Sequence, residues 1–518
     1  SAEGRTERFP GVVVADTGKR MSFEFFRLHP AFVGVLYRCG GLRAALRGNT
    51  ILGLFAVLVM AAFLLEQFEW VHAVLGALVL AAQPIFLYHL HVPASEVMQL
   101  LLLLGVLLVL PDRARAPWMG AATVASLLLG LLLNRFSFLP FACMMILAVA
   151  WADIGRTDRA RLIPERMLEV GAIAGGAWLD ALLAPTSLAG WSGQALPLLV
   201  SVGAVCLALS VALDSLGGFP AFRRHVHPAP FLWRRAGAVM GLVVLAGLYA
   251  AYRYGEGDDA DNLYRLLPYL GALPLSAAMV GGFLCAWRDR RCHRIAGTLL
   301  TAIFGMVVIV LVKKWAHDIY PWATRRYLVG AVPLVGIFAA YAMAAVWHAQ
   351  RVPGRRIVAV VLLLAVLGGH ARRSWHAWSR TETRGALAAL TEVAERLGPR
   401  DVVVVDTPRW GMPLRFLFGK HVLNGKHMWR RKDPDQVKAG LDALDKLRKQ
   451  GRRIRFLTTT RTHALNIYPH PIEPVTLDWQ SEEVALEAVD HSSRADDFEV
   501  TTVRNVLRLY TLKAPADG

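Results

Sequence analysis

The sequence predicts a polytopic α-helical membrane protein of about 12 transmembrane helices, with a C-terminal extracytoplasmic α/β domain. Three observations support this fold class. Hydrophobic residues make up 55% of the 518 residues, charged residues only 19%, and the mean hydropathy is +0.41. The apolar residues form long runs, whereas a soluble chain of this size would carry about a quarter charged residues. After His370 the composition changes to that of a soluble domain.

Twelve apolar segments are candidates for membrane crossings. Several fall short of the roughly 20 residues that cross about 30 Å of hydrocarbon as a helix, so one or two could be re-entrant. All are too long and too uniform for barrel strands, which alternate over about 10 residues. The segments lie near 50–67, 70–90, 96–111, 118–134, 136–152, 169–185, 195–214, 236–252, 265–287, 295–313, 327–347 and 356–370.

The Lys and Arg residues of the connecting loops predict the orientation. Alternate loops carry seventeen of them on one side and seven on the other, and the positive-inside rule places the richer set in the cytoplasm. The net charge of +18 therefore fits membrane topology better than a nucleic-acid partner. We predict three parts: an outer loop with a surface-lying amphipathic helix (1–48, the helix near 23–37), a transmembrane domain (49–370) and a soluble extracytoplasmic α/β domain (371–518).

The C-terminal part alternates helical and strand patterns. Residues 385–397 and 438–449 have helical periodicity, and 401–406 and 454–458 have the composition of buried strands. A final strand is expected within 503–512. This order predicts a small α/β domain with a partly parallel sheet.

A carboxylate, Glu96, stands in the second outer loop, which reads HLHVPASE. At the membrane boundary such a group is costly unless it faces a cavity or a partner, which favours a functional role. The alternative is helix capping by Ser95 and Glu96, and the sequence leaves both open. His89 and His91 are two residues apart, so they would not share a helix face, and a metal site from them alone is not expected.

The outer loop before the eleventh segment carries four cations on the side that should be poor in positive charge. Guanidinium groups beside aromatic rings suit a phosphate or pyrophosphate headgroup at the membrane surface. Asp318 could pair with one of these cations, and the aromatic residues could equally be interfacial belt residues. The predicted phosphate-binding residues are Lys313, Lys314, Tyr320, Trp322, Arg325 and Arg326.

Two further carboxylates are candidates for functional residues. Asp16 lies in the N-terminal outer stretch and could serve catalysis. Asp180 lies within the sixth apolar segment, where a carboxylate either has a function or pairs with a neighbouring helix.

The order of these sequence segments along the chain resembles that of bacterial polyprenyl-phosphate-dependent glycosyltransferases of the GT-C superfamily, in the branch of protein mannosyltransferases and aminoarabinose transferases. The resemblance rests on FFRLHPAF followed by GGLRAALRGN, on QPIFLYHLHVPASE, on PWATRRYL, and on DVVVVDTPRWGMPL at the start of the C-terminal domain. It implies an enzyme of the bacterial inner membrane that moves a hexosyl or pentosyl group from a polyprenyl-phosphate donor to a glycan, lipid or protein acceptor outside the cytoplasm.

The resemblance also implies residue roles. Glu96 corresponds to the acidic residue of the second outer loop, and Arg325 and Arg326 to the pair that holds the lipid phosphate. The family's catalytic base should follow its first membrane helix, and no matching motif is found. We therefore expect a chain that lacks this helix, with Asp16 as the remaining candidate. A divalent cation is compatible with the chemistry, but one carboxylate does not define a site for it.

Two other function classes fit the composition. A transporter or flippase for lipid-linked sugars or solutes would usually show internal repeats, and none is evident. A non-catalytic membrane assembly protein would use its C-terminal domain to bind a partner. In that domain TPRWG stands after the strand in place of a Gly-rich phosphate loop, so nucleotide binding is not expected.

Overall fold

The computed structural model contains two compact units, and each is considered by itself. One unit comprises Phe26–Ser379 and His491–Phe498, and the other comprises Ser1–Phe25, Arg380–Asp490 and Glu499–Gly518. The structure describes residues 7–9, 12–14, 21–23, 28–91, 95–109, 117–134, 159–183, 325–378, 385–406, 408–425, 434–458, 466–467, 470–471, 475–481, 484–490 and 499–512, with isolated helical positions between 142 and 284.

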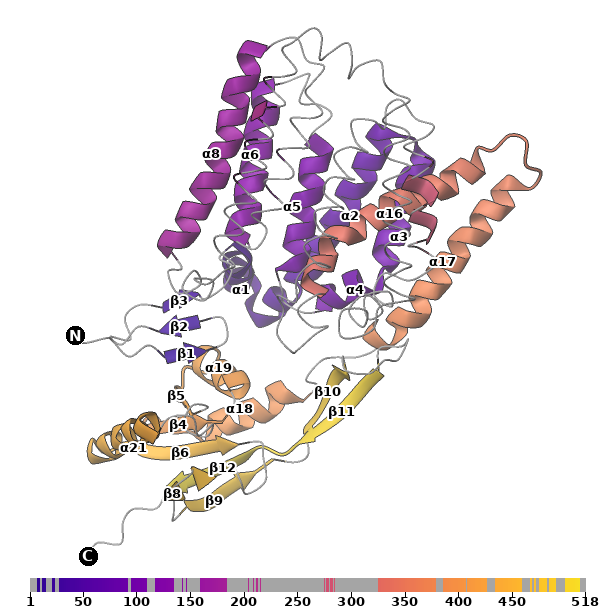
Figure 1. Ribbon diagram of the computed structural model, residues 1–518. Coiled ribbons are helices and arrows are strands. Elements are labelled where there is room, and N and C mark those ends of the chain that lie inside the picture. Colours follow the sequence, from indigo (N-terminus) through magenta and orange to yellow (C-terminus); the bar gives the residue numbers. More distant parts are fainter. Residues whose placement is uncertain are drawn as a thin grey trace, which may run out of the picture. The chain divides into compact units, whose positions relative to one another are not determined.

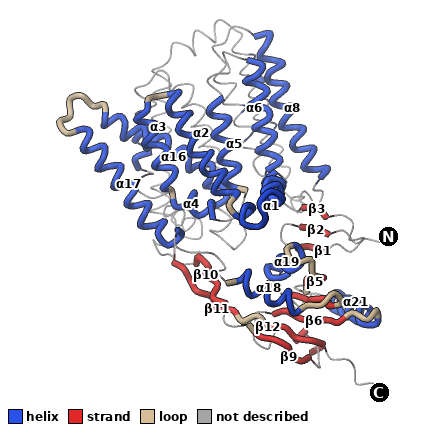
Figure 2. Tube along the Cα trace, turned by 180° about the vertical axis from the view of Figure 1, so that it is seen from behind, coloured by secondary structure: helices blue, strands red, loops and turns tan. Residues whose placement is uncertain are grey.

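The first unit is helical. In Figures 1 and 2, α8, α6, α5 and α2 stand side by side. Helix α3 packs against α2, α16 packs against α3, and α17 packs against α16. The described helices are α1 (Leu28–Leu46), α2 (Gly48–Gln67), α3 (Trp70–Ala82), α4 (Pro84–His91), α5 (Glu96–Val109), α6 (Pro117–Asn134), α8 (Arg159–Leu183), α16 (Arg325–Trp347) and α17 (Arg355–Trp378).

Helix α2 has one face in the core and one face exposed. Met60, Phe63 and Leu64 are fully buried against the neighbouring helices. Leu54 and Leu58, on the other face, are more than half exposed. A helix that exposes large aliphatic side chains at helical spacing is typical of contact with lipid, because a soluble protein rarely shows such a stripe.

The apolar segment at 70–90, expected as one crossing, is two helices. Helices α3 and α4 meet at an angle of 59° and together satisfy the length and hydropathy of one broken span or a re-entrant loop. The break falls at Gln83, which is extended (φ −63°, ψ 124°) before Pro84. Proline restricts the preceding residue to extended conformations and cannot donate to the helical ladder, which explains the bend.

The number of crossings stays a prediction. Among the described residues, α2 alone is long and apolar enough to cross a membrane as one straight helix. Shorter apolar helices occupy 96–109, 118–134 and 335–347. The expected segments 136–152, 195–214, 236–252, 265–287 and 295–313 lie outside the described residues, apart from the isolated helical positions.

The N-terminal helix differs from the expected range of 23–37. Strand β3 (Met21–Phe23) ends where the helix was expected to begin, and α1 starts five residues later at Leu28. Helix α1 continues to Leu46 but is interrupted at Gly40 and Gly41, and Gly41 has φ +67°. Glycine tolerates this left-handed conformation, so the pair GG permits a kink that the amphipathic pattern did not predict.

The second unit contains a mixed five-stranded sheet in the order β5-β4-β6-β12-β9. Strand β4 (Asp401–Val405) is fully buried and pairs in parallel with β5 (His421–Asn424) and β6 (Arg453–Thr458). Strand β12 (Arg508–Leu512) is antiparallel to both β6 and β9 (Val475–Gln480). The helices are α18 (Ala386–Arg396), α19 (Pro408–Phe416) and α21 (Pro434–Lys449).

Smaller sheets complete this unit. They are β1 (Glu7–Phe9), β2 (Val12–Val14) and β3; β7 (Asn466–Ile467) with β8 (His470–Pro471); and β10 (Val484–Asp490) with β11 (Glu499–Asn505). The expected helix 385–397, strands 401–406 and 454–458, and partly parallel sheet are confirmed. The expected strand at 503–512 is instead divided between β11 and β12, because Leu507 turns into the core and its N–H donates to Ser481 Oγ at 2.9 Å.

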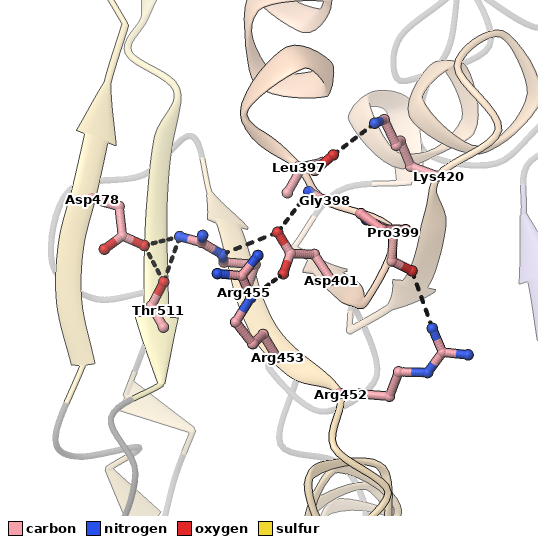
Figure 3. Close-up of polar contacts among 10 residues, drawn as sticks. All are labelled: Leu397, Gly398, Pro399, Asp401, Lys420, Arg452, Arg453, Arg455, Asp478 and Thr511. Atoms are coloured by element: carbon pink, nitrogen blue, oxygen red, sulfur yellow. Dashed lines mark hydrogen bonds and ion pairs between the residues drawn. The ribbon is translucent and has the colours of Figure 1, made fainter.

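A buried carboxylate joins the parallel strands at their amino ends (Figure 3). Asp401 accepts from Arg453 Nε at 2.8 Å and from the Gly398 N–H at 2.9 Å, and Arg455 Nε lies 3.6 Å away. Arg455 also contacts Asp478 and Thr511, on β9 and β12. A buried carboxylate is stable only when paired in this way, so Asp401 is a structural residue of the sheet.

Candidate functional site

Polar side chains gather at one end of the helical unit, where α2 and α5 begin and α4 and α6 end. Each is buried to more than nine-tenths, although the surrounding helices are almost wholly apolar. Since buried polar groups in a membrane helix bundle are costly, such a concentration indicates a functional region. We call it the polar cluster; its residues are His29, Asn49, His89, Ser95, Glu96, Gln99 and Asn134.

Asn49 links three helices of the cluster. Its Nδ2 donates to the backbone carbonyl of His89 at 3.0 Å, and its Oδ1 lies 2.8 Å from His29 Nε2. Because Oδ1 can only accept, His29 carries its proton on Nε2 in this bond. The side chain of Asn49 therefore ties the start of α1 and the end of α4 to the start of α2.

Asn134 makes the corresponding link between α6 and α5. Its Nδ2 donates to the Ser95 carbonyl at 2.9 Å, and the same oxygen accepts the Gln99 N–H at 3.1 Å. Two donors on one oxygen bring the end of α6 within a helical turn of Gln99. Leu28 and Leu102 also flank Gly130, one turn before Asn134, which places the start of α1 at this junction.

Glu96 is the first residue of α5 and is 3% exposed. Burial lowers the pKa of the nearby His29 imidazole; the Asn49 hydrogen bond and the negative charge of Glu96 both raise it but do not offset the burial. His29 is therefore neutral at pH 7, and Glu96 faces a neutral imidazole across the cluster. A buried carboxylate in such surroundings is placed to accept a hydrogen bond from a hydroxyl group.

Arg325 and Arg326 are the first two residues of α16, and the structure describes their backbone. Helix α16 runs antiparallel to α3: the rings of Trp347 and Trp70 lie 6.4 Å apart, and Gly336 packs against α3 at Gly76. Helix α4 follows α3 after the 59° bend, ends at the polar cluster and contacts α16. We infer that the first turn of α16 lies at the end of the unit that holds the polar cluster.

The other sequence candidates are placed as follows. His89 is buried in the cluster and His91 is exposed, so the two histidines face different surroundings. Asp180 lies in the last turn of α8, and only its backbone is described. Outside the described residues lie Asp16, Lys313, Lys314, Asp318, Tyr320 and Trp322.

Five members of the cluster were not predicted as site residues: His29, Asn49, Ser95, Gln99 and Asn134. A signal was present for two of them, because Gln99 lies inside the apolar run EVMQLLLLLG and Asn134 ends the apolar run LLLGLLLN. A polar residue in a membrane helix is a functional candidate by default, which would have selected both. His29 and Asn49 stand in mixed sequence, and their burial depends on packing that no local pattern reveals.

No protein-family model matches the chain, and no curated protein sequence matches it. Among solved structures, it aligns with the oligosaccharyltransferase of Archaeoglobus fulgidus in complex with Zn and sulfate, with a TM-score of 0.53 and 15% identity over 87% of this chain and 60% of that one. The chain shares the fold of the archaeal enzyme. The same enzyme tethered to an acceptor peptide with the NVT sequon gives a TM-score of 0.54 and 14% identity, over 85% of this chain and 61% of that one.

ArnT from Cupriavidus metallidurans bound to undecaprenyl phosphate aligns over 96% of this chain and 90% of its own. Its identity is 14% and its TM-score is 0.37, which is too low to indicate a common fold. The likeness to the archaeal oligosaccharyltransferase, at 14–15% identity, is a likeness of fold, and the expected GT-C superfamily stays a prediction for this chain. The chain spans about three fifths of the length of that enzyme.

The zinc ion of the archaeal structure prompts a test of the residues near Glu96. Within the described parts of the chain, no three His, Cys, Asp or Glu side chains are grouped so that they could hold a metal ion. The polar groups that the structure places at the first turn of α5 include the carboxamides of Gln99, three residues after Glu96, and of Asn134, which bonds the Ser95 carbonyl. These residues do not by themselves form a zinc site, and no step below depends on a metal.

Proposed function

We propose that this protein is a membrane glycosyltransferase that moves a hexosyl or pentosyl group from a polyprenyl-phosphate donor to an extracytoplasmic acceptor. The observation that carries the proposal is a buried carboxylate, Glu96, within a polar cluster at one end of the helical unit of a chain whose fold resembles that of the archaeal oligosaccharyltransferase. The bacterial inner membrane is its proposed location, and the C-terminal α/β domain lies outside the cytoplasm. The acceptor is a glycan, a lipid or a protein.

The residues fit the chemistry of this transfer. The acceptor hydroxyl attacks the anomeric carbon of the sugar, the bond from that carbon to the phosphate oxygen breaks, and the polyprenyl phosphate leaves. Glu96 binds a reacting hydroxyl and helps to take up its proton, with Asp16 as the second candidate for that role. Arg325 and Arg326, whose helix begins at the same end, neutralise the charge that develops on the leaving phosphate.

The C-terminal unit supports the proposal over a transporter. It is an α/β domain with its own buried core around Val403, Val405 and Leu457. A transporter has no evident use for such a domain, whereas an enzyme with an external acceptor can use it to bind that acceptor. This assignment is part of the proposal.

The test is sugar transfer by the full-length protein in proteoliposomes, supplied with polyprenyl-phosphate-linked sugars and membrane glycans, lipids or proteins as acceptors. Glu96→Gln should lower kcat by about 100-fold or more, the range of general acid–base contributions. Glu69→Gln is the matched control, because Glu69 is a 61% exposed carboxylate that pairs with His348. Transfer by Glu96→Gln at the wild-type rate would remove Glu96 from the reaction.

A further inference from the structure

Gln99 lies in the polar cluster with both polar atoms of its side chain buried. It is 2% exposed, and in the part of the chain that the structure describes neither Oε1 nor Nε2 has a hydrogen-bond partner. Asn134 is fully buried, and its Oδ1 likewise has no partner among the described residues, while its Nδ2 is bonded to Ser95. Burying an unpaired amide costs about 1–3 kcal/mol, so a ligand that bonds the Gln99 carboxamide would recover part of that cost.

These groups lie close together. Gln99 follows Glu96 by three residues on α5, so the two side chains share one helix face. The Gln99 N–H and Asn134 Nδ2 donate to the same carbonyl oxygen, that of Ser95, which brings the Asn134 side chain to that first turn. The first turn of α5 and the end of α6 thus bring a carboxylate and two carboxamides into one small region.

The chemistry of this region suits a neutral polyhydroxylated ligand. A carboxamide offers both donors and an acceptor, and each sugar hydroxyl both donates and accepts. A phosphate would instead require cations, because Arg and Lys supply the charge-assisted bonds that hold it. The cluster's described side chains include no Arg or Lys, and its one imidazole, His29, is neutral at pH 7.

We propose that Gln99 and Asn134 form the subsite that binds the hydroxyl groups of the transferred sugar. This inference rests on the proposed function and deepens it by dividing the donor between two places. The sugar lies on the first turn of α5 beside Glu96, and the phosphate lies at the first turn of α16. Gln99 and Asn134 are specificity-determining residues in this arrangement, and Glu96 is the group that acts on the reacting hydroxyl.

The first measurement is lipid binding by the full-length protein in nanodiscs. The probes are undecaprenyl phosphate and undecaprenyl phosphate linked to mannose, glucose, galactose or arabinose. Gln99→Met keeps the length of the side chain and removes its hydrogen-bonding groups. It should weaken binding of the preferred sugar-linked lipid about tenfold and leave undecaprenyl phosphate binding unchanged. Leu101→Met, on the same helix, is the control and should change neither. A sugar preference that survives in Gln99→Met overturns the subsite and leaves the proposed function standing.

The second measurement is thermal unfolding without ligand. Gln99→Met should unfold at a temperature equal to or above that of the wild type, because it removes an unpaired carboxamide from apolar surroundings. A lower unfolding temperature would mean that Gln99 has a structural partner, and the subsite would be overturned. This readout also distinguishes a binding defect from failure to fold.

The third measurement separates this inference from the proposed function. Methyl glycosides of the same four sugars, at high concentration, should raise the unfolding temperature of the wild type and not of Gln99→Met. If they do so while neither lipid binds, the sugar subsite stands and the polyprenyl-phosphate donor is wrong. If the wild type responds to no glycoside and shows no preference for a sugar-linked lipid, the subsite is overturned.

Discussion

The side-chain amide of Asn134, the last residue of α6, donates to the backbone carbonyl of Ser95, one residue before α5, at 2.9 Å. This bond crosses 39 residues of sequence and fixes the end of one helix to the start of the next. The polar cluster owes part of its geometry to it, so we expect its loss to affect stability.

Asn134→Leu removes this bond with little change in volume. We expect the free energy of unfolding to fall by about 1 kcal/mol, the usual value of a buried hydrogen bond between helices. Unfolding of the purified protein in detergent measures it. Ser126→Ala on the same helix is the control, because the Ser126 hydroxyl bonds only within α6 and is exposed. Equal stability of Asn134→Leu and the wild type would contradict a structural role for this bond.

Replacing Arg325 and Arg326 together by Ala should weaken undecaprenyl phosphate binding by about 10- to 100-fold, because each charge-assisted bond contributes roughly 1.5–3 kcal/mol before losses to solvent. The defect should shrink at high salt, which screens the wild-type attraction. Binding to nanodiscs across a salt series measures both effects. The paired control is Arg351→Ala with Arg356→Ala, two exposed cations near the opposite end of α16. If both double variants bind alike, the headgroup assignment is wrong.

His29 makes the stability of this region sensitive to acid. Its pKa in the folded protein lies below the ordinary value of 6.5, chiefly because it is buried. The unfolded chain therefore binds a proton that the folded chain does not, and stability falls as the pH drops below about 6.5. We expect the unfolding temperature to decrease between pH 7.5 and pH 5.5, and His29→Gln to reduce that decrease. The charge of Glu96 raises the pKa of His29, so Glu96→Gln should lower this pKa further and make the decrease larger.

The buried pairs of Asp401 predict a large effect in the C-terminal unit. Asp401→Ala leaves Arg455, whose side chain is 13% exposed, without one of its partners, and breaking a buried ion pair costs about 3–5 kcal/mol. Proteolysis of this unit in the full-length protein should report the loss as faster cleavage. Asp445→Ala is the control: Asp445 pairs on the surface of α21 with Arg448 and Lys449, and its removal should leave the cleavage rate unchanged. Similar cleavage rates for the two variants would show that the Asp401 pairs add no stability.

The predicted orientation has a direct test. In a cysteine-free background, Lys449→Cys places a thiol on an exposed position of α21, whose lysine is 78% exposed. A membrane-impermeant maleimide should label it in intact spheroplasts. Arg351→Cys, in the loop between α16 and α17, should react only after permeabilisation. The reverse pattern of labelling would mean that the orientation is inverted.

The fold class could be predicted from the sequence because hydropathy and charge are properties of short stretches of neighbouring residues. Long apolar runs, the change after His370 and the strand at 401–406 all follow from neighbouring residues. The bend at Gln83 could also have been predicted from the sequence, since Pro84 follows Gln83 directly. Glu96 was predicted as a site residue from its position at a membrane boundary, and its role stays a prediction. The contacts of Asn49 could not be predicted, because it bonds His29 across 20 residues and the His89 carbonyl across 40.

The last strand of the mixed sheet also determines when that sheet can form. Strand β12 lies between β6 and β9 and supplies hydrogen bonds to both, although it is the final described strand of the chain. Until residues 508–512 are in place, one edge of β6 and both edges of β9 have no neighbour in the sheet. Unpaired strand edges invite association with other chains. Completion of this sheet must therefore follow synthesis of the helical unit, and during that interval the edges of β6 and β9 are open to pairing with other chains.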